Sequence, residues 1–546
     1  MSSLIRTIRR CCRWVPSVLV VLPLAGLAFV ADERRSVYLR VLTNDANPFR
    51  AAMDAARGTD NFFSGGNFRP VGRFWEMLVH GFVYEAGEAT AVAPHIVLGA
   101  LRLTLVAVMA LGATAMVSAL ARSAGVQQHA SLVGLYPLAL GAVLIANGTS
   151  GALAQFPHTL IGSAVLIVWV AVATSRDRDL RARPLRWHEY AAMVSAGALA
   201  AMFYDLAYLA PLIAAVFLAA RCFASRMTLR AALATAATRR WVAQAAGFAA
   251  VFVPIRIAIA FQCSDGGCYE GSDLSLSADA FSTAWPRLLT GFPAVGWDFN
   301  ADLARDAGVE LGLADLAANA LMALVVVGIV VLAAAAAWQR PVPDTLATLH
   351  SSEAAGGGAG SSGRLAGVLL LLGGSLAVLS ASVAGLTAWA QQRQPPVGQA
   401  WRETLLTQVA WSLVIAAGLA VLDLALRGHA TNRIVRSLVA AALVLAMSLT
   451  LLANWRFAEV SRRDPVAVLT SLTSLSAVNL DDTPGGNAVR CALISAYTEA
   501  TAGQPSWTAG QAIGENLNDL TLERLGIPFC DPNRPAPAPQ SVQDPG

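Results

Sequence analysis

Long apolar segments recur along this chain of 546 residues, and they restrict its fold more than any other feature. A helix needs about 20 mostly apolar residues to cross the hydrocarbon core of a membrane. Segments that approach this length lie at residues 14–31, 94–120, 128–147, 158–174, 188–203, 206–222, 241–261, 313–337, 365–390, 403–426 and 434–454. The sequence therefore predicts an all-α polytopic membrane protein with about 11 transmembrane helices. A composition that is 56% hydrophobic and 14% charged excludes an ordinary soluble protein.

The arginines predict how these spans alternate across the membrane. The chain contains no lysine, and arginines gather after the second, fourth, sixth, eighth and tenth spans. Short loops rich in positive charge stay in the cytoplasm. We therefore expect a multi-pass protein of the plasma (inner) membrane, with a cytoplasmic N-terminus, a retained signal anchor at residues 14–31 and an external C-terminus. The alanine-rich, lysine-free composition indicates a high-GC bacterial genome.

The predicted transmembrane module covers residues 1–455 and is interrupted by longer segments. These are the first outer loop, the fourth outer loop and a cytoplasmic linker rich in glycine and serine, at residues 32–93, 262–312 and 339–364. The composition of the linker is typical of a flexible connection. Residues 456–530 carry enough apolar residues for a small external helical domain. The proline-rich tail at 531–546 is expected to be disordered.

The cysteines provide a second test of this topology, because disulfides persist only in oxidising compartments. The outer segments contain the pairs Cys263 with Cys268 and Cys491 with Cys530. The cytoplasmic side contains the others, which are Cys11, Cys12 and Cys222. We expect disulfides outside and thiols inside, and the sequence alone leaves the pairing open.

The first outer loop carries the signals of folded helices. Asn47 is a good N-cap, Pro48 suits the first helical position, and Gly58 is placed to end that helix. A second helix should begin at Pro70 and lie in the membrane interface. Its apolar face is predicted to carry Phe74, Trp75, Leu78, Val79 and Phe82. Its polar face is predicted to carry Arg73, Glu76 and His80.

Carboxylates in this loop are the candidate catalytic groups. Asp32 and Glu33 follow the first span directly, and Asp45 and Asp54 lie further along the loop. A carboxylate at such a place can remove a proton from an acceptor hydroxyl. The alternative is that each is a solvated charge of a surface loop.

Arginines near the outer ends of spans are the candidate anion-binding groups. Arg69 and Arg73 flank the start of the interfacial helix, whereas Arg102 and Arg256 lie inside predicted spans. An arginine inside a membrane span costs about 2.5–3.5 kcal/mol on insertion scales, which makes it a functional candidate. The alternatives are snorkelling to the headgroups and, for Arg256, an ion pair with Asp205.

The order of these motifs resembles the N-terminal region of GT-C membrane glycosyltransferases, in particular the protein O-mannosyltransferases with tetratricopeptide tails and their bacterial relatives. In that family an acidic pair follows the first span, an Arg-Pro motif opens an interfacial helix, and two histidines stand seven residues apart in the second span. Asp32 and Glu33 match the acidic pair, Arg69 and Pro70 match the Arg-Pro motif, and His95 matches the first histidine.

The chain also departs from that pattern. Arg102 occupies the place of the second histidine, and Tyr204 with Asp205 stands where the family has a Lys-Glu pair. There are no tetratricopeptide repeats, and the resemblance covers about the first 220 residues.

The resemblance implies transfer of a sugar from a polyprenyl-phosphate donor to a cell-envelope glycan, lipid or protein on the outer face of the membrane. Asp32 is then the general base, with Glu33 as helper and Asp45 and Asp54 in reserve. Together with the arginines singled out above, this gives as candidate substrate-binding residues Arg69, Arg73, His95, Arg102, Tyr204, Asp205 and Arg256. The sequence identifies neither the sugar, for which arabinose or mannose is natural, nor the acceptor or the oligomeric state.

Other functions stay open at this point. A transporter or lipid flippase is one, and an O-antigen ligase or polymerase, using Arg287 and Asp298 in the fourth outer loop, is another. A third is a non-catalytic membrane subunit. The sequence shows no metal-ligand cluster and no Walker motif, and it leaves a divalent cation open. The formal charge of +4 does not indicate nucleic-acid binding.

Overall fold

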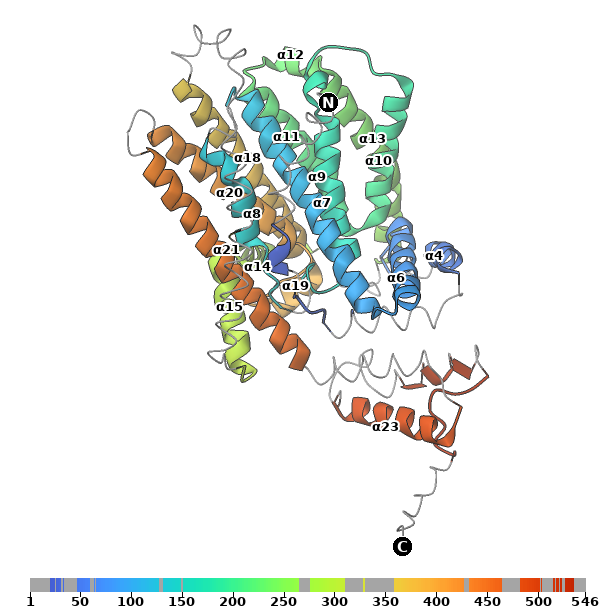
Figure 1. The fold of residues 1–546 in the computed structure, drawn as a ribbon. Helices are drawn as coiled ribbons and strands as arrows, with labels where there is room; N and C mark the ends of the chain where they lie inside the picture. Colours follow the sequence, from blue (N-terminus) through green and yellow to red (C-terminus); the bar gives the residue numbers. More distant parts are fainter. Residues whose placement is uncertain are drawn as a thin grey trace, which may run out of the picture. The chain divides into compact units, whose positions relative to one another are not determined.

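The computed structural model is all-helical, without strands, over the part of the chain that it describes (Figure 1). The described residues are 20–24, 26–30, 33, 47–58, 63, 65–126, 131–148, 151–264, 275–309, 328, 358–426, 432–463, 482–500, 502, 514–515, 517–519, 521–522 and 526–534. By length and composition, seven helical segments among them can cross a membrane, at Pro94–Ser123, Pro157–Thr174, Asp205–Ala224, Ala236–Gln262, Gly360–Gly385, Thr404–Ala425 and Ile434–Arg462. The chain is thus a multi-pass membrane protein.

The spanning segments belong to long helices that are joined by shorter ones. The long helices are α6 (Pro70–Thr90), α7 (Pro94–Ser123), α9 (Pro157–Thr174), α10 (Trp187–Phe203), α11 (Ala210–Ala224), α13 (Ala236–Gln262), α18 (Gly358–Gly385), α20 (Thr404–Ala425), α21 (Asn432–Arg463) and α23 (Pro484–Ala500). The shorter ones are η1 (Leu22–Leu24), α4 (Pro48–Arg57), η3 (Leu132–Leu135), α8 (Tyr136–Val143), η4 (Asp177–Leu180), η5 (Asp205–Leu209), α12 (Leu229–Leu233), α14 (Asp279–Thr290), α15 (Pro293–Asp306) and α19 (Ala388–Arg393).

Seven of the predicted spans are confirmed as membrane-length apolar helices, and four are not. The segment 188–203 forms α10, whose 17 residues fall just short of that length. The segment 128–147 is helical only over Leu132–Val143. Apart from residue 328, the segment 313–337 lies outside the described residues, as does much of 14–31.

The segment after Val143 leaves the helix because side-chain amides replace its helical hydrogen bonds. Asn454 donates to the carbonyl of Leu144 at 3.0 Å and accepts the N–H of Ala146 at 2.8 Å. Gln408 donates to the carbonyl of Ile145 at 2.6 Å. Backbone that is not helical is tolerated inside a membrane protein only where such partners satisfy it. Hydropathy alone predicted a full span here because it does not register these amides.

Contacts divide the chain into two units. The first comprises Met1–Leu27, Ala56–Arg73 and Gly99–Phe457, and the second comprises Ala28–Ala55, Phe74–Leu98 and Ala458–Gly546. In the first unit, α10 packs on α13 through two glycines. A Cβ on Gly197 would lie 2.0 Å from the carbonyl oxygen of Gln244, and one on Gly247 would lie 2.2 Å from that of Val194. Small residues of this kind allow membrane helices to approach closely.

One end of the first unit is held by an ion-pair cluster. Asp177 in η4 accepts from Arg122 at the end of α7 at 3.0 Å and from Arg221 at the end of α11 at 2.5 Å. Burial raises the pKa of Asp177, but the two guanidinium groups outweigh it and hold the pKa below its usual value. The segments after α7, α9 and α11 therefore meet at the same end, as the predicted alternation of spans requires.

In the second unit, the predicted helix signals of the first outer loop are confirmed. The side-chain oxygen of Asn47 accepts the N–H groups of Phe49 and Arg50 at 3.0 and 3.2 Å, and α4 begins at Pro48. A Cβ on Gly81 would lie 2.5 Å from Pro48, so a glycine in α6 allows the close contact.

The side chains on the two faces of α6 are not buried and exposed in the way that a helix on the protein surface would have them. Glu76 and His80, on the predicted polar face, are buried, whereas Phe82 on the apolar face is 59% exposed. An interfacial helix turns its apolar face to lipid and its polar face to water, but here two polar side chains are buried within the protein. The polar face is thus part of the interior.

The C-terminal part of the second unit contains α23 and a disulfide. Cys491 in α23 is bonded to Cys530, which confirms that predicted pair. Arg490 donates to the carbonyl of Phe529 at 2.6 Å beside it. Cys263 is also disulfide-bonded, while Cys268, its predicted partner, lies outside the described residues. Cys222 is a buried free thiol, as the sequence predicted.

Candidate functional site

The break between α10 and η5 exposes a polar corner in the first unit. The helix α10 ends at Phe203, Tyr204 has extended backbone, and η5 starts at Asp205. The ring of Tyr204 is buried, and the side chain of Asp205 is 18% exposed. The corner therefore presents a carboxylate and a tyrosine where two helices end and begin.

Arg69 reaches this corner from the segment before α6. Its guanidinium carbon lies 4.7 Å from the centroid of the Tyr204 ring, within the range of a cation–π interaction. Gly72 makes the approach feasible, since a Cβ there would lie only 1.9 Å from the carbonyl oxygen of Phe203. Two residues that the sequence placed in the substrate site, Arg69 and Tyr204, are thus brought together.

Arg402 approaches the same corner from the segment between α19 and α20. Its Nη1 lies 3.7 Å from Oδ2 of Asp205, and its guanidinium carbon lies 5.7 Å from the Tyr204 ring centroid. The neighbouring Trp401 is stacked on Trp389, with ring centroids 4.9 Å apart and planes 9° apart. Two hydrogen bonds with Asn147 anchor Gly398 and Ala400, which directly precede Trp401. Arg402 is therefore held in place by a fixed segment.

Arg256 completes the cationic side of the corner from α13. Its guanidinium carbon lies 5.3 Å from the ring centroid of Tyr208 and 5.6 Å from that of Phe252. Tyr208 and Asp205 both lie in η5. Three arginines thus surround one carboxylate and two tyrosines at one end of the helices.

A small cavity opens beside Asp205 and Arg402. Its polar lining includes Tyr204 and Thr387, and also Glu403, the residue just before α20. Glu403 is fully buried, and its Oε1 accepts the Nε–H of Arg287 at 2.7 Å. The lining thus combines the carboxylates of Asp205 and Glu403 with the guanidinium group of Arg402.

The remaining predicted substrate residues have other surroundings. Arg102 is buried and donates to the carbonyls of Leu27 and Leu153 at 2.6 and 2.9 Å, so it ties three chain segments together. Arg73 and His95 are half-buried near the starts of α6 and α7. The predicted catalytic residues Asp32 and Asp45 lie outside the described residues.

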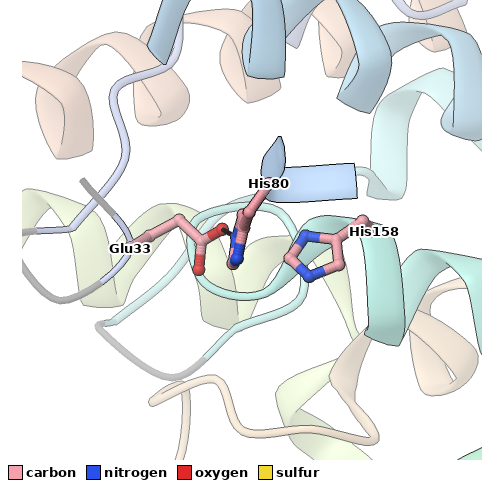
Figure 2. A group of neighbouring side chains, drawn as sticks. All are labelled: Glu33, His80 and His158. Carbon is pink, nitrogen blue, oxygen red and sulfur yellow. Dashed lines mark ion pairs between the residues drawn. The ribbon is translucent and has the colours of Figure 1, made fainter. Parts of the chain in front are cut away.

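Glu33, the helper of the predicted acidic pair, is ion-paired in the second unit. Its Oε1 lies 3.5 Å from Nε2 of His80, and both side chains are completely buried (Figure 2). Figure 2 also labels His158, which is buried at the start of α9. The Glu33 carboxylate and the His80 imidazole are groups that could ligate a metal ion. Sequence reasoning missed them because they are far apart along the chain.

Sequence reasoning also missed Arg402, Glu403 and Arg287 as members of one site. The signal was the charged pair in "WRET", directly before the apolar run that forms α20. On the predicted topology this pair lies on the same side of the membrane as Asp205. Arg287, considered only for a ligase, is fully buried against Glu403.

Comparison with known proteins identified no relative of this chain. No protein-family model matches the chain, and a search of the curated proteins found no match. Its class, a multi-pass membrane protein, rests on its helices, and its function must be argued from the site.

Proposed function

We propose that the protein is a membrane glycosyltransferase that uses a polyprenyl-phosphate sugar as donor. The observation that carries the proposal is the convergence of Arg69, Arg256 and Arg402 on the corner at Tyr204 and Asp205. Arg256 lies in a membrane-length helix, where an arginine marks a functional site by default, and a lipid phosphate is an anion that reaches such a site within the bilayer.

The arrangement suits a phosphate that becomes a leaving group. A guanidinium binds phosphate oxygens through forked, charge-assisted hydrogen bonds, and these are strong where water is excluded. Donors fixed before the reaction stabilise the charge that develops as the sugar–phosphate bond breaks. A bound phosphate would replace Asp205 as the partner of Arg402, whose present separation from it is 3.7 Å.

The residues that we assign to the acceptor are those that the sequence predicts. Asp32 is the proposed general base that removes the proton of an acceptor hydroxyl, with Glu33 as an orienting group and Asp45 in reserve. We place the reaction on the outer face of the membrane, where a cell-envelope glycan, lipid or protein is the acceptor. A divalent cation would be held by the carboxylate of Glu33 and the imidazole of His80.

The test is donor turnover by purified full-length protein. It would be incubated with polyprenyl-phosphate arabinose or polyprenyl-phosphate mannose and a cell-envelope acceptor extract, and release of free polyprenyl phosphate would be measured. Arg402→Ala should reduce release about 100-fold, the usual effect of losing one transition-state donor. Asp32→Asn should reduce it at least as much.

Arg305→Ala is the matched control, because Arg305 is 75% exposed and pairs only with nearby Asp302 in the described part of the chain. It should retain wild-type release. The proposal fails if the wild-type protein turns over neither donor, or if Arg402→Ala releases polyprenyl phosphate at the wild-type rate.

A further inference from the structure

Two arginines converge on one glycine near the start of α18. A Cβ placed on Gly360 would lie 3.8 Å from Nη2 of Arg226 and 4.0 Å from Nη1 of Arg364. Nη2 of Arg364 donates to Oγ of Ser361 at 3.4 Å, and its Nε is buried without a hydrogen-bond partner in the described part of the chain. No described carboxylate pairs with either guanidinium group. Because like charges repel, an anion between the two groups would stabilise this arrangement.

Acidic side chains at this end of the helices bind other arginines. The start of α18 lies beside the end of α20, since a Cβ on Gly363 would lie 4.0 Å from Cδ2 of Leu424. Asp423 of α20 pairs with Arg436 of α21 at 3.2 Å. Asp177 is shared by the arginines at the ends of α7 and α11. The positive charge near Gly360 is therefore available to an anion from outside the protein.

An open stripe of helix surface leads from the arginine pair along α18. Residues spaced alternately four and three apart share one face of a helix. Those of this stripe are Gly360, Arg364, Gly367, Leu371, Gly374 and Val378. No atom lies within 4 Å of a Cβ placed on Gly367 or Gly374, and Leu371 and Val378 are 49% and 54% exposed. Because Gly360–Gly385 has the length of a membrane span, the stripe suits a hydrocarbon chain.

Exposed apolar side chains also flank Arg226. Phe223 lies three residues before it in α11 and is 63% exposed. Leu229 and Leu233 lie one turn apart in α12, and both are exposed. Cationic and apolar side chains placed together in this way are typical of the boundary between lipid headgroups and acyl chains. The anion that this surface fits is thus one attached to a hydrocarbon chain.

We propose that this surface binds a phospholipid of the bilayer, with its phosphate between Arg226 and Arg364 and one acyl chain along the open stripe. Guanidinium groups bind phosphate oxygens through forked hydrogen bonds. Basic pockets between membrane helices on the cytoplasmic side bind anionic headgroups, and the predicted topology assigns this end to that side. The site goes beyond the proposed donor site, because the whole of α11 lies between Asp205 and Arg226.

Equilibrium binding of radiolabelled phosphatidylglycerol to full-length protein in a nonionic detergent tests the proposal. Arg364→Gln should raise the Kd about 10-fold, because one charge-assisted hydrogen bond contributes by that order. Arg226→Gly should have the same effect. This variant should keep the thermal unfolding temperature of the wild type, because the φ of Arg226 is 55°, which glycine adopts without strain. Its loss of binding can then not be ascribed to misfolding.

A second measurement distinguishes a lipid from free phosphate. Gly367→Leu places a large side chain on the stripe and should raise the Kd for phosphatidylglycerol at least about 4-fold, the effect of losing contact with one methylene group. Inorganic phosphate in excess should not displace the lipid from the wild-type protein. Arg305→Gln removes a positive charge from an exposed position in α15 and is the control, which should keep the wild-type Kd.

Each other result would overturn the proposal. A Kd that is unchanged in Arg226→Gly and Arg364→Gln would mean that the two arginines hold no phosphate. Displacement by inorganic phosphate together with an unchanged Kd in Gly367→Leu would mean that the site takes free phosphate and not a lipid. Equal weakening in Arg305→Gln would mean that the lipid binds through overall charge, without a site at Gly360.

Discussion

Arg402 lies 3.7 Å from Asp205, although 197 positions separate them along the chain. Each side chain is 18% exposed, so the pair is accessible to a ligand while still shielded from bulk water. A carboxylate beside an arginine competes with any other anion for that arginine.

Asp205→Asn should therefore strengthen binding of bare polyprenyl phosphate. Loss of the competing carboxylate leaves Arg402 without this counter-charge and removes repulsion of the phosphate. We expect Kd for polyprenyl phosphate to fall about 3- to 10-fold, measured by equilibrium binding at fixed salt. An unchanged or higher Kd would place the phosphate elsewhere.

Gly72→Ala should weaken the site through its geometry. Its Cβ would lie 1.9 Å from the carbonyl oxygen of Phe203, a backbone atom that cannot turn aside. Overpacking of this kind costs about 1–3 kcal/mol, and it would move Arg69 away from Tyr204. We expect a lower thermal unfolding temperature together with weaker binding of lipid phosphate.

Gly374→Ala provides the comparison for that substitution. Gly374 lies within α18 and no atom lies within 4 Å of a Cβ placed there. Alanine favours helix over glycine by up to about 1 kcal/mol, so this variant should be as stable as the wild type or slightly more so. If Gly72→Ala behaves in the same way, the close approach to Phe203 does not matter.

Asp177→Asn should lower stability in a pH-dependent manner. Arg122 and Arg221 depress the pKa of Asp177, so its stabilising effect is present above the unfolded pKa of about 3.9 and is lost as pH falls through the lower folded value. At neutral pH we expect a loss of about 1 kcal/mol, since the carboxylate is half exposed and screened.

Thermal unfolding of the wild type and Asp177→Asn at pH 7 and near pH 3 measures this effect. The difference between the two proteins should be clear at pH 7 and should shrink at the acidic value. An equal difference at both values would mean that the charge of Asp177 has no part in stability.

Metal analysis tests the buried pair in the second unit. Glu33 and His80 offer a carboxylate and an imidazole, ligands that suit zinc and similar divalent ions. We expect about one equivalent of such an ion in protein purified without chelator, and its loss in Glu33→Gln and His80→Ala. His188→Ala, at an exposed histidine, should retain it. Metal-free wild-type protein would leave the pair as an ion pair only.

Local patterns predicted much of the fold because they act over a few residues. Hydropathy located seven spans, and the caps at Asn47 and Pro70 fixed the starts of α4 and α6. The position of Arg402 against Asp205 could not be read in this way, since it depends on how distant helices pack. The burial of His80 was also missed. The sequence pattern predicts a polar face for α6, but it does not show whether that face is turned to water or to the interior of the protein.

The amides that support the chain after Val143 set an unusual limit on engineering. Asn454 and Gln408 are more polar than their neighbours, so a hydropathy criterion would favour replacing them with leucine. Such a change would deprive the carbonyls of Leu144 and Ile145 of the donors that they have in place of a helix. Raising the hydropathy of these two positions would therefore destabilise the buried non-helical segment instead of stabilising the protein in the membrane.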